Sequence, residues 1–138
     1  MVRIELMDWD RARAYASPIR FTVFVDEQRV PAEIELDEHD ARCVHAVAFD
    51  RQTPVGTGRL LPDGHIGRMA VLKEWRGRGI GTLLLHALIE KARERGHREV
   101  VLSAQIHAMP FYKAHGFTEE GEEYMDAGIP HRDMRRAL

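Results

Sequence analysis

The sequence predicts an α/β or α+β fold in which helices flank one mixed, mostly antiparallel sheet of six to seven strands. Three observations carry this prediction. Strand-like runs joined by short turns occur in both halves of the chain. One long run with helical periodicity lies between two of these strands, as in a parallel crossover. The 138 residues have the length of one domain, which we place at 1–138.

The first forty residues predict a strand, helical segments and a surface loop. Residues 2–7 alternate apolar and charged side chains, which is typical of a half-buried strand. Asp8 precedes a helical pattern over 9–28, in which Pro18 predicts a break into two pieces. Residues 31–40 contain five acidic residues and neither Lys nor Arg, so we expect a surface loop there.

The middle of the chain predicts three strands followed by a long helix. Runs at 44–49 and 55–61 are joined by a hairpin-length turn, and a short strand follows at 65–71. Residues 79–95 change to helical periodicity. Gly96 then predicts the end of this helix.

The last forty residues predict a strand, a short helix and a final pair of strands. Residues 99–103 form an apolar run typical of a strand, and 108–115 a short helix closed by a glycine. The runs at 117–125 and 129–136 complete the sheet.

Composition and charge exclude several classes of protein. The formal net charge is −2, which gives no long-range attraction to nucleic acid or to anionic lipid. No apolar run is long enough for a membrane span, and the first residues lack the order of a signal peptide. Cys43 is the single cysteine, which excludes a disulfide framework. We therefore expect a cytoplasmic protein that binds neither nucleic acid nor membrane.

A glycine-rich turn lies between the strand at 65–71 and the long helix. It reads Arg-Gly-Arg-Gly-Ile-Gly-Thr over 76–82. Its three glycines allow backbone N–H groups to approach a ligand, and the helix start adds unpaired donors, so the turn suits a phosphate or pyrophosphate. The alternative is a tight connection whose arginines are only solvated. The pattern fits neither the nucleotide-triphosphate loop nor the dinucleotide fingerprint, since Gly-Lys-Ser/Thr and the third spaced glycine are both missing.

The turn matches Arg-x-x-Gly-x-Gly, and with its neighbours it resembles the GNAT superfamily of N-acetyltransferases. The strand at 66–71 and the linker 73–76 resemble the elements that lead into the superfamily's pyrophosphate loop. Residues 108–117 resemble its Ala-x-x-Phe-Tyr-x-x-x-Gly-Phe signature. Residues 25–31 and 126–131 resemble a small bacterial branch of the superfamily.

The resemblance implies acetyl-CoA as co-substrate, with no metal. Acetyl-CoA would lie in a V-shaped opening between 65–71 and 99–103, and its pantetheine amides would pair with backbone groups. Gln105 stands where the superfamily commonly has Asn, which implies a further cofactor contact. The implied cofactor-binding residues are Met69, Ala70, Val71, Arg76, Gly77, Arg78, Gly79, Ile80, Gly81, Thr82 and Gln105.

The resemblance also implies a general acid and leaves the general base open. Tyr112 of the signature would give its proton to the thiolate leaving group, since a tyrosine near its reference pKa of ~10 is protonated at pH 7. The backbone N–H near Ala70 or Val71 would polarise the thioester. Candidate bases are Glu27, Glu38 and His131, which should border the cleft. His45, His65 and His107 are weaker candidates, and nothing in the sequence identifies a base for an acetyl-cysteine at Cys43.

We therefore expect transfer of an acetyl group from acetyl-CoA to a primary amine of a small molecule or amino sugar. A non-catalytic acyl-CoA-binding regulatory domain is the alternative, and a phosphate-binding module would leave the Phe-Tyr signature unexplained. The sequence leaves a homodimer open. The acceptor is also open. The acidic segment 33–40 would attract a cationic amine, whereas four arginines could bind a phosphorylated or carboxylated one: Arg20, Arg29, Arg68 and Arg132.

Overall fold

The strands form two antiparallel sheets in the computed structural model, which describes residues 1–35 and 37–138. The first sheet has the order β1-β2-β3-β4, from Val2–Met7, Val44–Asp50, Thr53–Leu60 and Ile66–Val71. The second has the order β5-β7-β6, from Glu99–Gln105, Ile129–Ala137 and Thr118–Asp126. The seven strands and their mostly antiparallel pairing agree with the sequence prediction. They form two sheets rather than one, and a parallel bridge between His65 and Val101 connects the two.

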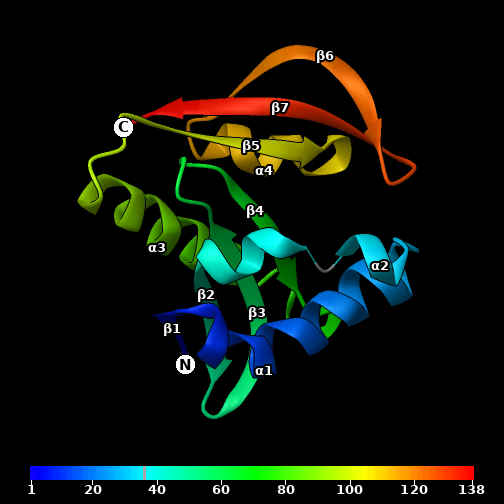
Figure 1. Cartoon of the computed structure of the whole chain (residues 1–138), viewed down its shortest axis with the longest axis vertical. Helices are drawn as coiled ribbons and strands as arrows, with labels where there is room; N and C mark the ends of the chain where they lie inside the picture. The colour runs from blue at the N-terminus through cyan, green and yellow to red at the C-terminus, as the bar shows by residue number, and fades with distance from the viewer. Residues whose placement is uncertain (36) are drawn as a thin grey trace.

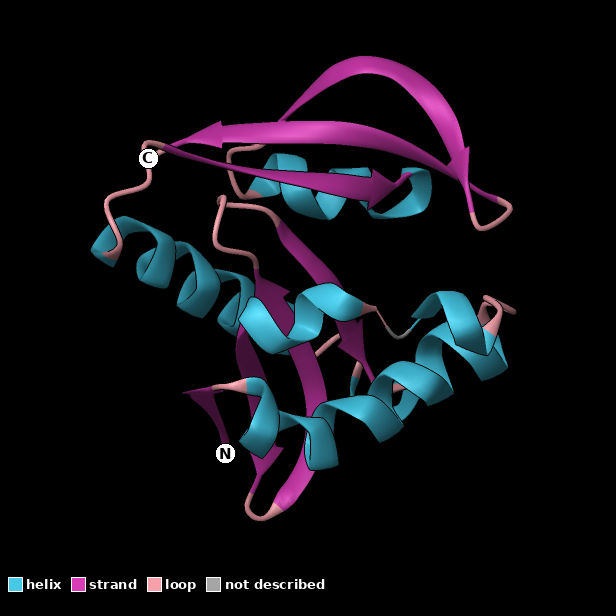
Figure 2. Ribbon diagram, viewed as in Figure 1, coloured by secondary structure: helices cyan, strands magenta, loops and turns pink. Residues whose placement is uncertain are grey.

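Helices α1 (Trp9–Arg20) and α3 (Ile80–Glu94) pack on the first sheet. Alternate side chains of β2 separate the two helices: Ala46 and Ala48 belong to the core cluster that includes the α3 leucines, whereas Val47 packs with Ala12 of α1. The two helices therefore cover opposite faces of this sheet. The second sheet lies in the upper part of Figures 1 and 2, beside the short helix α4 (Met109–Ala114).

Helix α1 continues through Pro18, so the predicted break at that proline is wrong. Its inner side, with Ala12, Ala16 and Ile19, is buried, and this tertiary packing outweighs the hydrogen bond that the proline cannot donate. The helix changes type only after Arg20, where a π-helical segment covers Phe21–Glu27. The region does contain two helical pieces, but the boundary lies beyond the proline.

The acidic segment 31–40 is not the surface loop that its composition predicts. It contains a short helix, α2 (Ala32–Glu35), and the start of a 3₁₀ turn, Glu38–Arg42; Leu36 lies outside the described residues. Glu35 and Asp40 are only 3% and 2% exposed. Their burial depends on arginines elsewhere in the chain, which the local composition does not reveal.

Helix α3 begins and ends close to the predicted positions. Its N-cap is Gly79 with a φ of 79°, and Gly96, with a φ of 84°, follows its last turn. Both are left-handed conformations that glycine adopts without strain. Within the described residues, no helix has the length and apolarity of a membrane span.

Candidate active site

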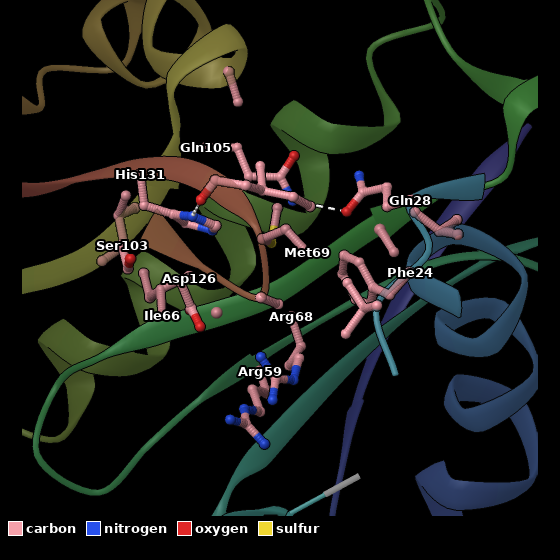
Figure 3. Close-up of a pocket in the computed structure, with 18 of the residues that line it drawn as sticks. Phe24, Gln28, Arg59, Ile66, Arg68, Met69, Ser103, Gln105, Asp126 and His131 are labelled. Atoms are coloured by element: carbon pink, nitrogen blue, oxygen red, sulfur yellow. Dashed lines mark hydrogen bonds between the residues drawn. The ribbon is translucent and has the colours of Figure 1, made fainter. Parts of the chain in front are cut away.

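A cavity of about 630 Å³ lies where β4 and β5 diverge from the bridge between His65 and Val101. Its walls come from both sheets and from the segment that follows α1 (Figure 3). The side chains that line it include Phe24, Gln28, Arg68, Met69, Ser103, Gln105, Tyr112, Asp126 and His131. The opening between the two strands that the family resemblance implies is therefore present in the structure.

Strand β4 carries an irregularity that leaves its outer edge open. The register between β3 and β4 shifts in mid-strand, and Arg68 adopts a φ of 48° there. The Leu72 N–H donates to the Val55 carbonyl at 3.0 Å. Because antiparallel pairs alternate, the N–H of Val71 must then point away from β3. Val71 lines the cavity, so this donor lies on the edge where β5 has separated.

The glycine turn 76–82 leads from β4 into α3. Gly77 and Gly79 have φ values of 77° and 79°, and no heavy atom lies within 4 Å of the position that a Cβ would occupy on either. A Cβ on Gly81, one residue inside the helix, would contact the ring of Phe111 at 3.4 Å. The backbone of the turn is therefore accessible to a ligand.

A second cavity of about 310 Å³ lies over this turn. It is lined by Val71, Trp75, Arg76, Gly77, Gly79, Ile80, Gly81, Thr82 and Phe111. Val71 and Arg76 also line the first cavity, so the two spaces adjoin each other. Together they run from the open edge of β4 to the N-terminus of α3, whose unpaired N–H groups and dipole favour an anion.

The side chain of Arg76 is held on two sides. Its two terminal nitrogens each donate to one carboxylate oxygen of Glu27 at 3.0 Å, and its Nε donates to the Val71 carbonyl at 2.9 Å. Glu27 is one of the predicted bases, but it lines neither cavity. The structure thus places the Glu27 carboxylate beside the residue that begins the glycine turn, and outside both cavities.

Tyr112, the predicted acid, lies on α4 with 9% of its surface exposed, and it lines the first cavity. Its ring packs against Phe111 and Phe117. Burial raises the pKa of the Tyr112 phenol to about 12. The hydroxyl has no hydrogen bond to any residue that the structure describes. It is therefore a protonated donor beside the cavity.

His131, another predicted base, also lines the cavity and is 9% exposed. Its Nδ1 lies 2.7 Å from the Ile129 carbonyl oxygen. Because a carbonyl can only accept, Nδ1 carries the hydrogen, and Nε2 of the neutral ring is left as an acceptor. Its ring also stacks on that of Tyr124. These contacts fix both the tautomer and the orientation of the imidazole.

Gln105 connects the end of β5 to the segment after α1. Its Nε2 donates to the Gln28 Oε1 at 2.7 Å, along a dashed line in Figure 3, and its Oε1 accepts from the His107 Nε2 at 2.5 Å. All three side chains line the cavity. The predicted contact residue is therefore held in one orientation by neighbours on both sides.

A network of charges, most of them buried, borders the cavity. It joins three arginines to three carboxylates: Arg20, Arg59 and Arg68 with Glu35, Asp37 and Asp40. Burial would raise the pKa of Asp37, but the hydrogen bonds and charges of the arginines outweigh it and bring that pKa to about 2. The same balance lowers the pKa of Asp40. Arg20, at 1% exposure, is thus engaged in the core, which corrects the expectation that it could reach an acceptor.

The other predicted candidates are not gathered at the cavity, apart from His65 and His107, which line it. Glu38 is exposed and lines neither cavity. His45 is 1% exposed, burial lowers its pKa, and its Nε2 lies 2.9 Å from the Asp40 carbonyl oxygen. Burial raises the pKa of the Cys43 thiol to about 11, which disfavours the thiolate that a nucleophile needs.

The sequence did not single out Phe24, Ser103 or Asp126 as individual cavity residues. Ser103 ends the run 99–103 that was expected to border the opening, and Asp126 begins the segment 126–131 that resembles the bacterial branch. No local pattern marked Phe24. In the part of the chain that the structure describes, no group of three His, Cys, Asp or Glu residues is placed to hold a metal ion.

Comparisons with known proteins agree with this geometry. A family model described as an acetyltransferase (GNAT) domain matches residues 12–138. An uncharacterized N-acetyltransferase of Bacillus subtilis, YjcF, is 43% identical over 122 residues, which cover 86% of this chain and 87% of that protein. The crystal structure of an acyl-CoA N-acyltransferase from Pseudomonas aeruginosa matches with a TM-score of 0.88 and 29% identity, over 99% of this chain and 100% of that one. Escherichia coli ElaA matches with a TM-score of 0.88 and 27% identity, over 99% of both chains.

Proposed function

The chain belongs to the GNAT acetyltransferase family, and we propose that it transfers an acetyl group from acetyl-CoA to a primary amine of a small molecule or amino sugar. The observation that carries this proposal is the separation of β4 from β5, with the glycine turn at one end of the adjoining cavities and Tyr112 beside them. The thioester, the pantetheine and the pyrophosphate of an acyl-CoA each have a matching group along this path.

The donor would lie along the open edge of β4. The backbone groups of the stretch from Met69 to Val71 that face away from β3 would pair with the pantetheine amides, as in the addition of a strand to a sheet edge. The pyrophosphate would accept N–H groups from the turn 76–82, where the positive φ values of Gly77 and Gly79 keep side chains out of the approach. Gln105, fixed by its two partners, would contact the pantetheine from the side of β5.

The reaction would be direct attack of the amine on the thioester. The Val71 N–H would polarise the carbonyl as negative charge develops on its oxygen. His131 would first accept a proton from the ammonium through its Nε2, which frees the lone pair that attacks the thioester. Tyr112 would then protonate the departing thiolate, and its raised pKa of about 12 keeps the phenol protonated for that role. The second proton, lost from the nitrogen as the tetrahedral intermediate collapses, would replace the one that Tyr112 gives up.

The charges around the cavity favour a cationic acceptor. Each arginine of the buried network has a carboxylate partner within it. Asp126, by contrast, lines the cavity and forms no ion pair with any described residue. An uncompensated carboxylate at the mouth of a cavity attracts an ammonium group and opposes a phosphate or carboxylate.

The test is the release of free thiol from acetyl-CoA in the presence of a panel of amines: diamines, amino sugars and amino acid amides. The proposal predicts turnover that depends on both the amine and the protein. CoA binding without turnover on any amine would instead support the non-catalytic acyl-CoA-binding domain. Absence of both binding and turnover would contradict the proposal.

A further inference from the structure

Two adjacent residues, Glu27 and Gln28, connect to opposite sides of the opening between β4 and β5. Glu27 pairs with Arg76, which follows β4, whereas Gln28 accepts from Gln105, the last residue of β5. Neither connection follows from secondary structure, since the partners lie 49 and 77 positions away along the chain. The end of the π-helical segment is therefore tied to both strands between which the donor would lie.

The connection on the side of β4 is an ion pair with defined geometry. Both oxygens of the Glu27 carboxylate accept from the Arg76 guanidinium at 3.0 Å, and the third donor of that guanidinium reaches the carbonyl of Val71. The two side chains are 31% and 42% exposed. Exposed ion pairs usually contribute little, but two-point geometry is the case in which they do contribute.

The connection on the side of β5 is a single hydrogen bond of 2.7 Å between two amides. Figure 3 shows it as a dashed line between the segment after α1 and the end of β5. Gln105 also accepts a hydrogen bond from His107, so its amide cannot rotate toward a different partner without breaking this second hydrogen bond. The position of Gln28 therefore influences that of Gln105.

The backbone around these residues explains how neighbouring side chains reach opposite strands. The Gln28 N–H donates to the Val23 carbonyl at 3.1 Å, which is the wider spacing of a π-helical turn, and Arg29 then adopts a φ of 62°. The helix therefore ends at Gln28 and the chain reverses. Segments of π-helix inside or after α-helices occur frequently at functional sites.

We propose that Glu27 and Gln28 form a brace that sets the separation of the glycine turn and the end of β5 for donor binding. This inference rests on the proposed function, since it requires that acyl-CoA lies between β4 and β5. Glu27 acts through Arg76 on the pyrophosphate end of the site, and Gln28 acts through Gln105 on the pantetheine end. Both are positioning residues, and the Glu27 carboxylate, with both oxygens bound to Arg76 and outside both cavities, does not accept the proton of the amine.

Glu27→Gln tests the connection on the side of β4. Acetyl-CoA is compared with S-acetylpantetheine, an acyl donor that lacks the pyrophosphate. We expect KM for acetyl-CoA, and Kd for CoA by calorimetry, to rise by about three- to tenfold at nearly constant kcat. KM for S-acetylpantetheine should not change. The effect of Glu27→Gln should disappear in an Arg76→Met background, because the carboxylate then has no partner. Glu94→Gln, which removes an exposed ion pair with Lys91 on α3, is the matched control and should leave both donors unaffected.

Gln28→Met and Gln28→Glu test the connection on the side of β5. Gln28→Met removes the hydrogen-bond acceptor at similar size, so it should weaken the binding of acetyl-CoA and of S-acetylpantetheine about equally. Gln28→Glu retains an oxygen that can accept from Gln105 and should therefore bind both as the wild type does. Loss of kcat with an altered pH profile in Glu27→Gln would make Glu27 the base and overturn the brace. Unchanged CoA affinity in both Glu27→Gln and Gln28→Met would overturn it as well. A wild-type protein that does not bind CoA would overturn the proposed function together with the brace.

Discussion

His65 lies beside Val101 in a parallel bridge, and from this point β4 and β5 separate. Each strand continues to pair with its own sheet on its far side. The facing edge of β4 beyond the bridge therefore has no strand partner among the described residues. Backbone N–H and C=O groups in such a position need hydrogen-bond partners, and an extended ligand with amides of its own can supply them.

Gly79→Val should weaken CoA binding by at least about tenfold, because a branched side chain would occupy the space through which the pyrophosphate approaches the turn. The variant should also lose about 1–2 kcal/mol of stability, since its φ of 79° is strained for any residue with a Cβ. Calorimetric titration with CoA and urea unfolding measure the two effects. Gly96→Val is the matched control: its φ of 84° predicts the same loss of stability, but it lies outside both cavities and should leave CoA affinity unchanged. Equal loss of affinity in both variants would contradict the assignment of the turn.

Tyr112→Phe should lower kcat by about 10²–10⁴-fold while CoA affinity stays nearly constant, because the ring and its packing remain and only the proton donor is lost. In the wild-type protein, a pKa of about 12 keeps Tyr112 protonated, so kcat should show no alkaline decrease from this group below about pH 10. Steady-state kinetics with an accepted amine provide both measurements, and Tyr15→Phe, on the exposed side of α1, is the control. Full turnover in Tyr112→Phe would assign the proton transfer to water or to another side chain.

His131→Gln should lower kcat by about 10²–10⁴-fold, because the acceptor for the amine proton is lost. CoA affinity should change little, since the imidazole is assigned to the acceptor. His86→Gln, on the exposed part of α3, controls for the loss of an imidazole elsewhere. Full turnover in His131→Gln would exclude His131 as the base.

Asp40→Asn should destabilise the fold by about 3–5 kcal/mol, because removing one partner of a buried ion pair leaves uncompensated charge. Asp40 bridges Arg20 and Arg59 at 2.8 Å and is 2% exposed. Urea unfolding measures the effect, and Glu94→Gln, which breaks an exposed pair, should cost less than about 1 kcal/mol. A loss of similar size in both variants would mean that the buried network does not support the fold.

Local patterns were sufficient for the elements whose side chains alternate with the period of a strand or helix. Helix α3 is an example. The glycine turn at 76–82 was also predictable, because its conformation depends on glycines close together in the sequence. Long-range partners explain the errors. The burial of Glu35 and Asp40 requires Arg20 and Arg59, and no periodicity indicates that these groups meet.

The candidate site also combines features that depend on local sequence with features that depend on long-range partners. The turn and Tyr112 lie in contiguous motifs, so the sequence alone could propose them as candidates. The position of Glu27 depends on Arg76, which lies 49 residues further along the chain, so its carboxylate could not be separated from the other candidate bases beforehand. The irregularity in β4 was also not predicted. A glycine inside the neighbouring strand run, Gly58, was a sequence signal for a bulge or a close approach. In the structure, a Cβ there would lie 2.5 Å from the Met69 Sδ.

The measurement that tests the central claim most directly is the free energy of unfolding with and without acetyl-CoA. A ligand that binds only the native chain at 100 times its Kd should add about 2.7 kcal/mol. We predict a gain of this size for the wild-type protein, with one molecule bound per chain, and a much smaller gain at the same concentration for Gly79→Val. No stabilisation of the wild-type protein at millimolar acetyl-CoA would contradict the claim that the opening between β4 and β5 binds an acyl donor.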